Sequence, residues 1–239
     1  MQKIDILAIG VHPDDVELAC CGTLMAHMDM GYSVAICDLT QGELGSRGSG
    51  PLRLEEARKA ASLMGVTTRE NLGMEDGYFM HTPENINKIV RIIRKYQPEI
   101  IFCNAVHDRH PDHGRAAKLV SDACFYSGLP KIQVYEEGKE LMAWRPKAVY
   151  HYIQDRNLKP DFVVDITQYM ERKVACILAF ESQFFAAKDQ TVETPISSKD
   201  FFEFIYAKAR TYGRDIQATY AEGFTVERTP GVRNIMELI

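Results

Sequence analysis

The sequence contains no block of like charges, and its 28 Lys and Arg residues are outnumbered by 33 Asp and Glu residues. Proteins that bind nucleic acids usually carry a basic patch or stripe for the phosphate backbone. The formal net charge of -5 at pH 7 therefore argues against a nucleic-acid partner. Since no apolar run reaches the length of a membrane-spanning helix, we also expect no membrane partner.

Signs of secretion are missing as well. Residues 1–5 lack the basic segment, the long apolar segment and the small-residue cleavage site that define a secretory signal. None of the 6 cysteines belongs to a C-x-x-C pair, and most have apolar neighbours. Such cysteines are typical of buried, reduced thiols rather than of a disulfide framework. These absences predict a cytoplasmic location.

What the sequence does contain is an alternation of apolar runs and amphipathic stretches. The runs IDILAIGV (4–11), SVAICDL (33–39) and EIIFC (99–103) are apolar enough for strands that are covered on both faces. Stretches with helical periodicity separate them, and strand–helix–strand units of this kind produce parallel sheets with right-handed crossovers. The pattern predicts an α/β fold, with a Rossmann-like, mostly parallel sheet and helices on both faces.

The pattern becomes less regular in the last third of the chain. We expect a single domain over residues 1–239, with a Rossmann-like core at 1–128 and a C-terminal elaboration at 129–239. Helices are predicted at 14–30, 53–64, 83–96, 112–126, 167–182 (with Thr167 as N-cap) and 198–212, further strands at 68–72, 148–153 and 162–166, a loop at 184–197, and a tail with little periodicity around Tyr220 and Phe224.

Two short clusters of His and Asp follow apolar runs. HPDD (12–15) ends the first run, and HPDH (110–113) follows EIIFC. The carboxyl ends of parallel strands meet at one edge of an open α/β sheet, where the ligand crevice opens. A hydrolytic metal site needs about three protein ligands and one open position. We expect His12, Asp15 and His113 to converge on one divalent metal, because His12 and Asp15 are i, i+3 neighbours at a helix start.

The other members of the clusters have the chemistry of proton transfer. Asp14 lies between two expected ligands, where a carboxylate can take a proton from water that a metal has acidified. His110 can face the same cavity and either stabilise an oxyanion or protonate a leaving amine. Asp112 is the expected partner that orients His110 and raises its pKa. A lone Asp at a helix start is usually an N-cap, but two matching clusters indicate a joint site.

These motifs resemble those of the PIG-L/LmbE-like zinc deacetylases. That family has A-H-P-D-D near its N-terminus and A-H-x-D-H farther along the chain, whereas here Val11 precedes the first cluster and Arg109 the second. The segments TQGELGSRG (40–48), NLGMEDG (71–77) and YAEGF (220–224) are similar to the subgroup that deacetylates N-acetylglucosaminyl-malate in bacillithiol biosynthesis. The departures fall on positions that are not ligands.

The resemblance implies an activity and its cofactor. The expected reaction removes the acetyl group from an N-acetylglucosamine derivative, a small-molecule sugar. One Zn2+ per chain is expected on His12, Asp15 and His113. The family also implies a homo-oligomer, such as a hexamer.

The resemblance implies roles for other residues too. Asp14 matches the general base, and His110, with Asp112 as its partner, matches the residue that stabilises the tetrahedral intermediate. Arg53 matches an arginine at the pocket mouth. Guanidinium groups bind carboxylates well, so we expect Arg53 and Arg109 to bind the carboxylates of malate. Weaker candidates for the cavity wall are Arg47, Glu43, His107 and Asp108, whereas His27, His81 and His151 are expected to be structural or exposed.

Three alternatives remain open at this point. A related amidase that cleaves sugar-thiol conjugates would share the zinc motif. Two His and one carboxylate also form the facial triad of non-haem iron oxygenases, which usually have β-barrel folds. A sugar-binding module could use a metal without turnover, although Asp14 and His110 are then unexplained.

Overall fold

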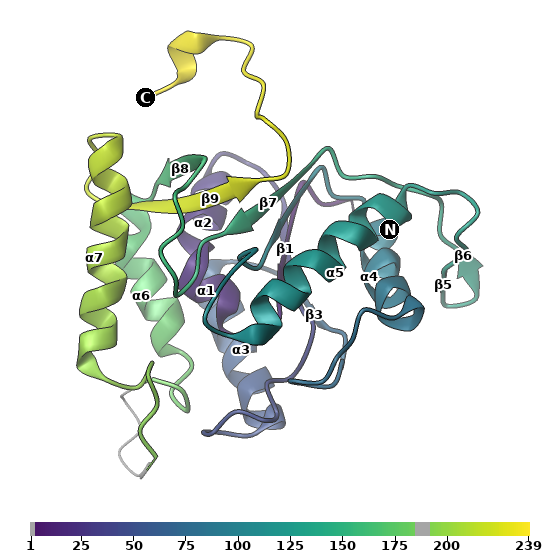
Figure 1. The fold of residues 1–239 in the computed structure, drawn as a ribbon, viewed down its shortest axis with the longest axis horizontal. Coiled ribbons are helices and arrows are strands. Elements are labelled where there is room, and N and C mark those ends of the chain that lie inside the picture. Colours follow the sequence, from purple (N-terminus) through teal and green to yellow (C-terminus); the bar gives the residue numbers. More distant parts are fainter. Residues whose placement is uncertain (1–2, 185–191) are drawn as a thin grey trace.

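The centre of the computed structural model, which describes residues 3–184 and 192–239, is a seven-stranded sheet in the order β3-β2-β1-β4-β7-β9-β8 (Figure 1). The first five strands in this order run parallel, and β9 runs antiparallel to β7 and β8. The strands are β1 (Ile6–Gly10), β2 (Val34–Asp38), β3 (Thr68–Asn71), β4 (Ile100–Cys103), β7 (Ala148–Tyr152), β8 (Phe162–Asp165) and β9 (Ala221–Val226), and a separate hairpin pairs β5 (Tyr135–Glu136) with β6 (Lys139–Glu140).

Helices cover both faces of the sheet. They are α1 (Asp15–Ala19), α2 (Cys21–Asp29), α3 (Gly50–Met64), α4 (Pro83–Tyr96), α5 (Pro111–Ser127), α6 (Met170–Leu178) and α7 (Lys199–Asp215), with short 3-10 turns η1 (Thr167–Tyr169) and η2 (Ile235–Glu237). The predicted α/β fold is confirmed.

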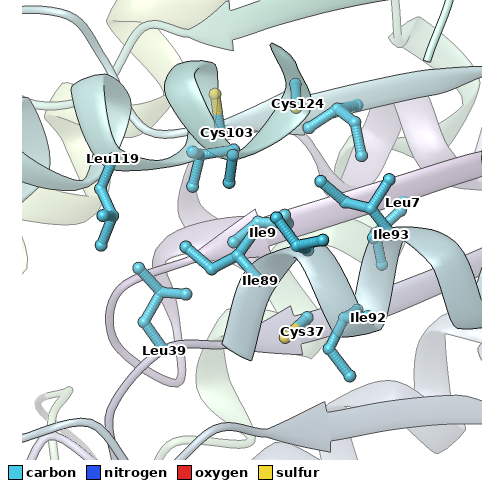
Figure 2. Packing of buried hydrophobic residues seen from close by; sticks show 14 of the residues in the cluster. Leu7, Ile9, Cys37, Leu39, Ile89, Ile92, Ile93, Cys103, Leu119 and Cys124 are labelled. Atoms are coloured by element: carbon cyan, nitrogen blue, oxygen red, sulfur yellow. The ribbon is translucent and has the colours of Figure 1, made fainter. Parts of the chain in front are cut away.

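Alternate residues of the central strands enter two different cores. Leu7 and Ile9 of β1 pack with residues of α4 and α5, as Figure 2 shows. Ile6 and Ala8 point the other way, into a core that includes residues of α1, α2, α3 and α6. A fully buried aliphatic side chain contributes about 1.5–3 kcal/mol. Burial on both faces explains why these strands read as continuous apolar runs.

The strand β9 was not predicted. Its sequence, AEGFTV, places Glu222 and Gly223 in the middle, and these residues are poor strand formers. Nevertheless β9 lies between β7 and β8 within the sheet. Glu222 is buried because Lys173 of α6 forms an ion pair with its carboxylate at 2.6 Å. The tail was therefore misread because the partner of its acidic residue is far away in sequence.

The predicted helix over 14–30 is broken at Cys20, whose φ of -142° and ψ of 6° are not helical. Glu222 accepts hydrogen bonds from the N–H groups of Gly22 and Thr23 at the start of α2, at 3.1 and 2.7 Å. Lys173 donates to the carbonyl of Leu18 in α1 at 2.8 Å. Backbone groups freed at a helix end need such partners, and a carboxylate also suits the positive end of a helix.

The prediction of Thr167 as a helix N-cap was wrong. Its hydroxyl accepts the N–H groups of Thr219 and Tyr220, at 3.2 Å each, and so binds the chain just before β9. The helix there begins at Met170 and ends at Leu178. Of the predicted loop at 184–197, residues 185–191 lie outside the described residues. Within the part of the chain that is described, no helix is long and apolar enough to cross a bilayer.

Candidate active site

The two His/Asp clusters lie at the carboxyl ends of neighbouring strands. HPDD (12–15) follows β1 and HPDH (110–113) follows β4, and these two strands pair directly. The chain goes from β1 to β2 on one side and places β4 on the other, so the clusters flank a topological switch point. The ring centroids of His12 and His110 are 4.8 Å apart, and those of His110 and His113 are 5.1 Å apart.

Three buried side chains at this edge could hold a divalent metal. The candidate ligand atoms of His12, Asp15 and His113 lie within 4.8 Å of one another. His113 Nε2 is 3.2 Å from Asp15 Oδ1, and His12 Nδ1 is 3.7 Å from Asp15 Oδ2. Two imidazoles and a carboxylate fit zinc, which takes nitrogen and oxygen ligands and leaves a position open in catalytic sites.

His12 and His113 each have one ring nitrogen near Asp15, and the other ring nitrogen of each contacts a further carboxylate. Asp76 Oδ1 is 3.0 Å from His12 Nε2, and Asp108 Oδ2 is 2.6 Å from His113 Nδ1. Metal-binding histidines almost always donate their other N–H to such a group, which fixes the tautomer. His12 Nδ1 and His113 Nε2 are therefore the nitrogens left for a metal, and both face Asp15. The ligand atoms of a second grouping, His12 with His110 and Asp112, lie equally close together. In this grouping His110 Nδ1 contacts the backbone N–H of Asp112, and no carboxylate of the described residues bonds to the His110 ring.

The pKa values show how strongly acidic this environment is without a cation. Burial lowers the pKa of His12, but hydrogen bonds with Asp112 and Asp76 outweigh it and raise that pKa to about 9. Burial likewise opposes protonation of His113, yet the charge of Asp15 and the bond to Asp108 raise its pKa to about 10. The site thus holds excess negative charge, which a divalent cation would neutralise.

Asp14 has an unusual backbone conformation next to the candidate metal ligands. Its φ of 141° lies in a region that residues with a side chain rarely adopt, at a typical cost of about 1–3 kcal/mol. It occupies the N-cap position of α1, but its carboxylate makes no capping hydrogen bond. Instead its Oδ2 lies 2.9 Å from Arg53 Nη2. Burial raises the pKa of Asp14 to about 6, although the charge of Arg53 opposes that rise.

His110 and Asp112 are not paired as predicted. The carboxylate of Asp112 accepts hydrogen bonds from the Gly77 N–H and from Arg115, at 3.0 Å each. His110 Nδ1 accepts the backbone N–H of Asp112 at 3.3 Å. Burial lowers the pKa of His110, together with the charges of His12 and His113, so the predicted rise is not seen. His110 is therefore neutral near pH 7, and its Nε2 carries the proton.

Comparison with known proteins places this geometry in a family. The model of the PIG-L family, described as GlcNAc-PI de-N-acetylase, matches residues 7–124. A diacetylchitobiose deacetylase of Thermococcus kodakarensis is 30% identical over an alignment of 239 positions, which covers 95% of this chain and 84% of that protein. The chain belongs to the PIG-L family. Membership and these relatives identify it as a hydrolytic N-deacetylase.

Further relatives of this PIG-L chain support the fold and the family. The crystal structure of a conserved protein from Thermus thermophilus has a TM-score of 0.85 and 31% identity, covering 97% of this chain and 98% of that one. A probable N-acetyl-alpha-D-glucosaminyl L-malate deacetylase 2 of Bacillus anthracis is 20% identical over an alignment of 193 positions, which covers 75% of this chain and 81% of that protein.

The two arginines predicted to bind substrate occupy different places in the PIG-L site. Arg53 is buried and donates to the carbonyls of Pro13 and Gly42 as well as to Asp14, at 2.9 Å and 3.3 Å for the two carbonyls. Its guanidinium is therefore largely committed to holding Asp14. Arg109 lies at the rim, where it forms a largely exposed ion pair with Asp155 at 2.8 Å.

The weaker candidates for the cavity wall also occupy different places. Asp108 lines the cavity and orients His113. Glu43 accepts the N–H of Asp76 at 3.0 Å, and so supports the loop that carries this residue. His107 is exposed and is not among the residues that line the cavity, and Arg47 donates to the carbonyl of Gln183 instead. The remaining three histidines are not among the residues that line the cavity: His27 contacts the Thr23 carbonyl, His81 contacts Asp122, and His151 contacts Glu227 and the Asn104 carbonyl.

Three polar residues of the PIG-L site were missed in the sequence. Asp76 orients His12, as described above. Asn104 donates to Asp15 Oδ2 at 2.9 Å, and Gln154 donates to Asp15 Oδ1 at 3.0 Å. All three follow the carboxyl end of a sheet strand, namely β3, β4 and β7. That position was the signal that could have identified them, because polar side chains there face the crevice.

Proposed function

We propose that this chain removes the acetyl group from an N-acetylglucosamine derivative, with one Zn2+ held by His12, Asp15 and His113. The observation that supports this most directly is the convergence of these three buried side chains beside Asp14 and His110 in one cavity. When bound there, zinc supplies a Lewis acid that polarises the amide carbonyl and acidifies water.

The protein's own groups divide the proton transfers. Asp14 takes a proton from the water whose oxygen attacks the acetyl carbon. The same Asp14, now protonated, returns that proton to the amine nitrogen as the carbon–nitrogen bond breaks, so that acetate and a free amine result. A pKa of about 6 suits both directions, since a base works best when its pKa is near the working pH. Arg53 keeps the carboxylate in place.

His110 acts on the opposite side of the acetyl group. Because its Nδ1 accepts a backbone N–H, its Nε2–H is the group that can donate into the cavity. A hydrogen bond to the oxygen that gains negative charge during attack stabilises the transition state more than the substrate. Asp112, in contrast, supports the site through Gly77 and Arg115.

The finer proposal for the substrate is N-acetylglucosaminyl-malate, in bacillithiol biosynthesis. It rests on the segments at 40–48, 71–77 and 220–224 and on the name of the Bacillus anthracis relative. The Thermococcus kodakarensis relative is named for diacetylchitobiose instead. These two compounds differ in the group attached to the sugar, and the reaction at the acetamide is the same.

The test is acetate release from a small panel of substrates. N-acetylglucosaminyl-malate, diacetylchitobiose and N-acetylglucosamine are incubated with the purified protein, with chelator, and with chelator followed by zinc. Activity that chelator abolishes and zinc restores is expected, and the highest kcat/KM is expected for the malate compound. Sugar binding without acetate release from any compound would instead favour a binding module. A cytoplasmic location and a homo-oligomer stay predictions, the latter open to sedimentation analysis.

A further inference from the structure

The cavity extends well beyond the reacting groups. Its volume is about 370 Å3, and its walls run from His12 and Asp14 to α7 and β9. One part of this cavity, which we call the α7 chamber, is lined by Leu18 of α1 and by side chains of α7. Its lining residues from α7 include Phe204, Ile205, Lys208 and Tyr212. No role in deacetylation falls to this chamber, yet it is continuous with the site.

Among the residues that the structure describes, four lysines and arginines line this cavity. For Lys208, Nζ is buried and has no hydrogen-bond partner in the described residues. The centroid of the Phe204 ring lies 5.5 Å from this Nζ. The other three cations are paired: Arg53 with Asp14, Arg109 with Asp155, and Lys173 with Glu222.

Tyr212 presents a second unsatisfied group. Its side chain is nearly fully buried, with 7% of the residue exposed, and its hydroxyl likewise lacks a partner among the residues that the structure describes. Tyr212 follows Lys208 by one helical turn, so the two side chains share a face of α7. The ring is held firmly, because Gly223 packs against it so closely that a Cβ there would lie 3.0 Å from a ring carbon.

Burial of an ammonium and a hydroxyl without hydrogen-bond partners costs free energy, unless a bound ligand supplies the missing hydrogen bonds. Burial lowers the pKa of Lys208 to about 8, while the charges of Asp108 and Asp155 oppose that shift. Lys208 is therefore still mainly protonated at neutral pH. One positive charge and one neutral donor match a group with one negative charge and two acceptor oxygens.

We propose that Lys208 and Tyr212 form a subsite for a carboxylate on the part of the substrate that is remote from the acetamide. The proposal rests on the proposed function, deacetylation of an N-acetylglucosaminide with an acidic aglycone, and adds which side chains bind the acidic group. A carboxylate fits better than a phosphate dianion, whose second charge would be buried without a counterion. The subsite also differs from the rim, where Arg109 is the rival carboxylate binder.

A matched pair of substrates tests the subsite. One is an N-acetylglucosaminide with a carboxylate on its aglycone, and the other is its methyl ester. The ratio of their kcat/KM values is measured for the wild type and for Lys208→Met, Lys208→Gln, Tyr212→Phe and Arg109→Ala. Lys159→Met is the control, because Lys159 is exposed and outside the cavity lining. Thermal melting identifies any variant that fails to fold.

We expect the wild type to prefer the carboxylate. Both Lys208 variants should lose about 10-fold to 100-fold of this preference, the scale of a lost hydrogen bond to a charged group. Tyr212→Phe should lose less, and Lys159→Met none. A preference that survives in folded Lys208 variants, or that falls only in Arg109→Ala, overturns the proposal.

Failure of the proposed function has a different signature. In that case the wild type releases acetate from neither compound. The subsite is then tested by calorimetric binding of the same two compounds to the zinc-loaded protein. Tighter binding of the carboxylate that is lost in Lys208→Met supports the subsite, and equal binding of the two compounds refutes it.

Discussion

Replacement of Asp108 by Asn should weaken metal binding although Asp108 is not among the proposed ligands. Its carboxylate lies 2.6 Å from His113 Nδ1, with only 1% of the side chain exposed. Asparagine keeps the shape and an acceptor oxygen but removes the charge. Loss of such an outer carboxylate typically reduces metal affinity about 10-fold to 100-fold, which corresponds to about 1.4–2.7 kcal/mol.

Two opposing effects decide the size of this change. Without the charge of Asp108, the pKa of His113 falls from about 10, so that fewer protons compete with the metal. The same charge attracts a divalent cation more strongly than a single proton, however, so the loss for the metal is larger. The net result is weaker binding, and Asp76→Asn should act in the same direction through His12.

Competition with a chromophoric zinc chelator at fixed pH measures the affinity. The matched control is Asp122→Asn, because Asp122 forms a comparable pair with His81 at 2.7 Å on the exposed surface. Affinity should be unchanged in that variant. An Asp108→Asn protein that binds zinc as tightly as the wild type would refute the proposed arrangement of ligands.

The same structure leads to four further predictions. The Asp14→Asn variant should bind zinc normally, yet its kcat should fall roughly 100-fold to 10,000-fold. For the wild type, kcat/KM should fall as the pH drops below about 6, because Asp14 must be ionised to act as a base. The pKa values of His12 and His113 are raised to about 9 and about 10, so both rings are protonated at neutral pH without metal. Zinc binding should therefore release two protons, and the affinity for zinc should increase as the pH rises. Calorimetry in buffers of different ionisation enthalpy measures the number of protons released. Residues 1–128 expressed alone should not give a cooperative thermal unfolding transition, because β4 would lose its pairing with β7.

The sequence was sufficient for features that depend on local pattern. The strands around Leu7, Ile36 and Ile101 are apolar on both faces, which only a covered parallel sheet explains. The positions of HPDD and HPDH after two such strands then placed them at one edge. No contact had to be known in advance, because the edge of a parallel sheet collects the ends of all its strands.

Features that depend on distant contacts were missed. The break at Cys20 and the strand β9 both rest on Glu222, whose carboxylate joins segments 200 residues apart. The role of Asp76 depends on the approach of the loop after β3 to His12, and the pairing of Asp112 with Arg115 depends on the path of α5. Such contacts carry no periodic signal, since a single side chain in a loop or at a helix start is compatible with many partners.

The Glu222 contact also sets an order of events during protein synthesis. Gly22 and Thr23 leave the ribosome early, whereas the carboxylate that holds the N–H group of Gly22 is translated 200 residues later. Until then the turn between α1 and α2 lacks its partner, and the sheet lacks β9. A nascent chain that already exposes both His/Asp clusters therefore still lacks the partner of the first N–H groups of α2. Translation thus separates the appearance of the His/Asp clusters from the completion of the sheet that carries them.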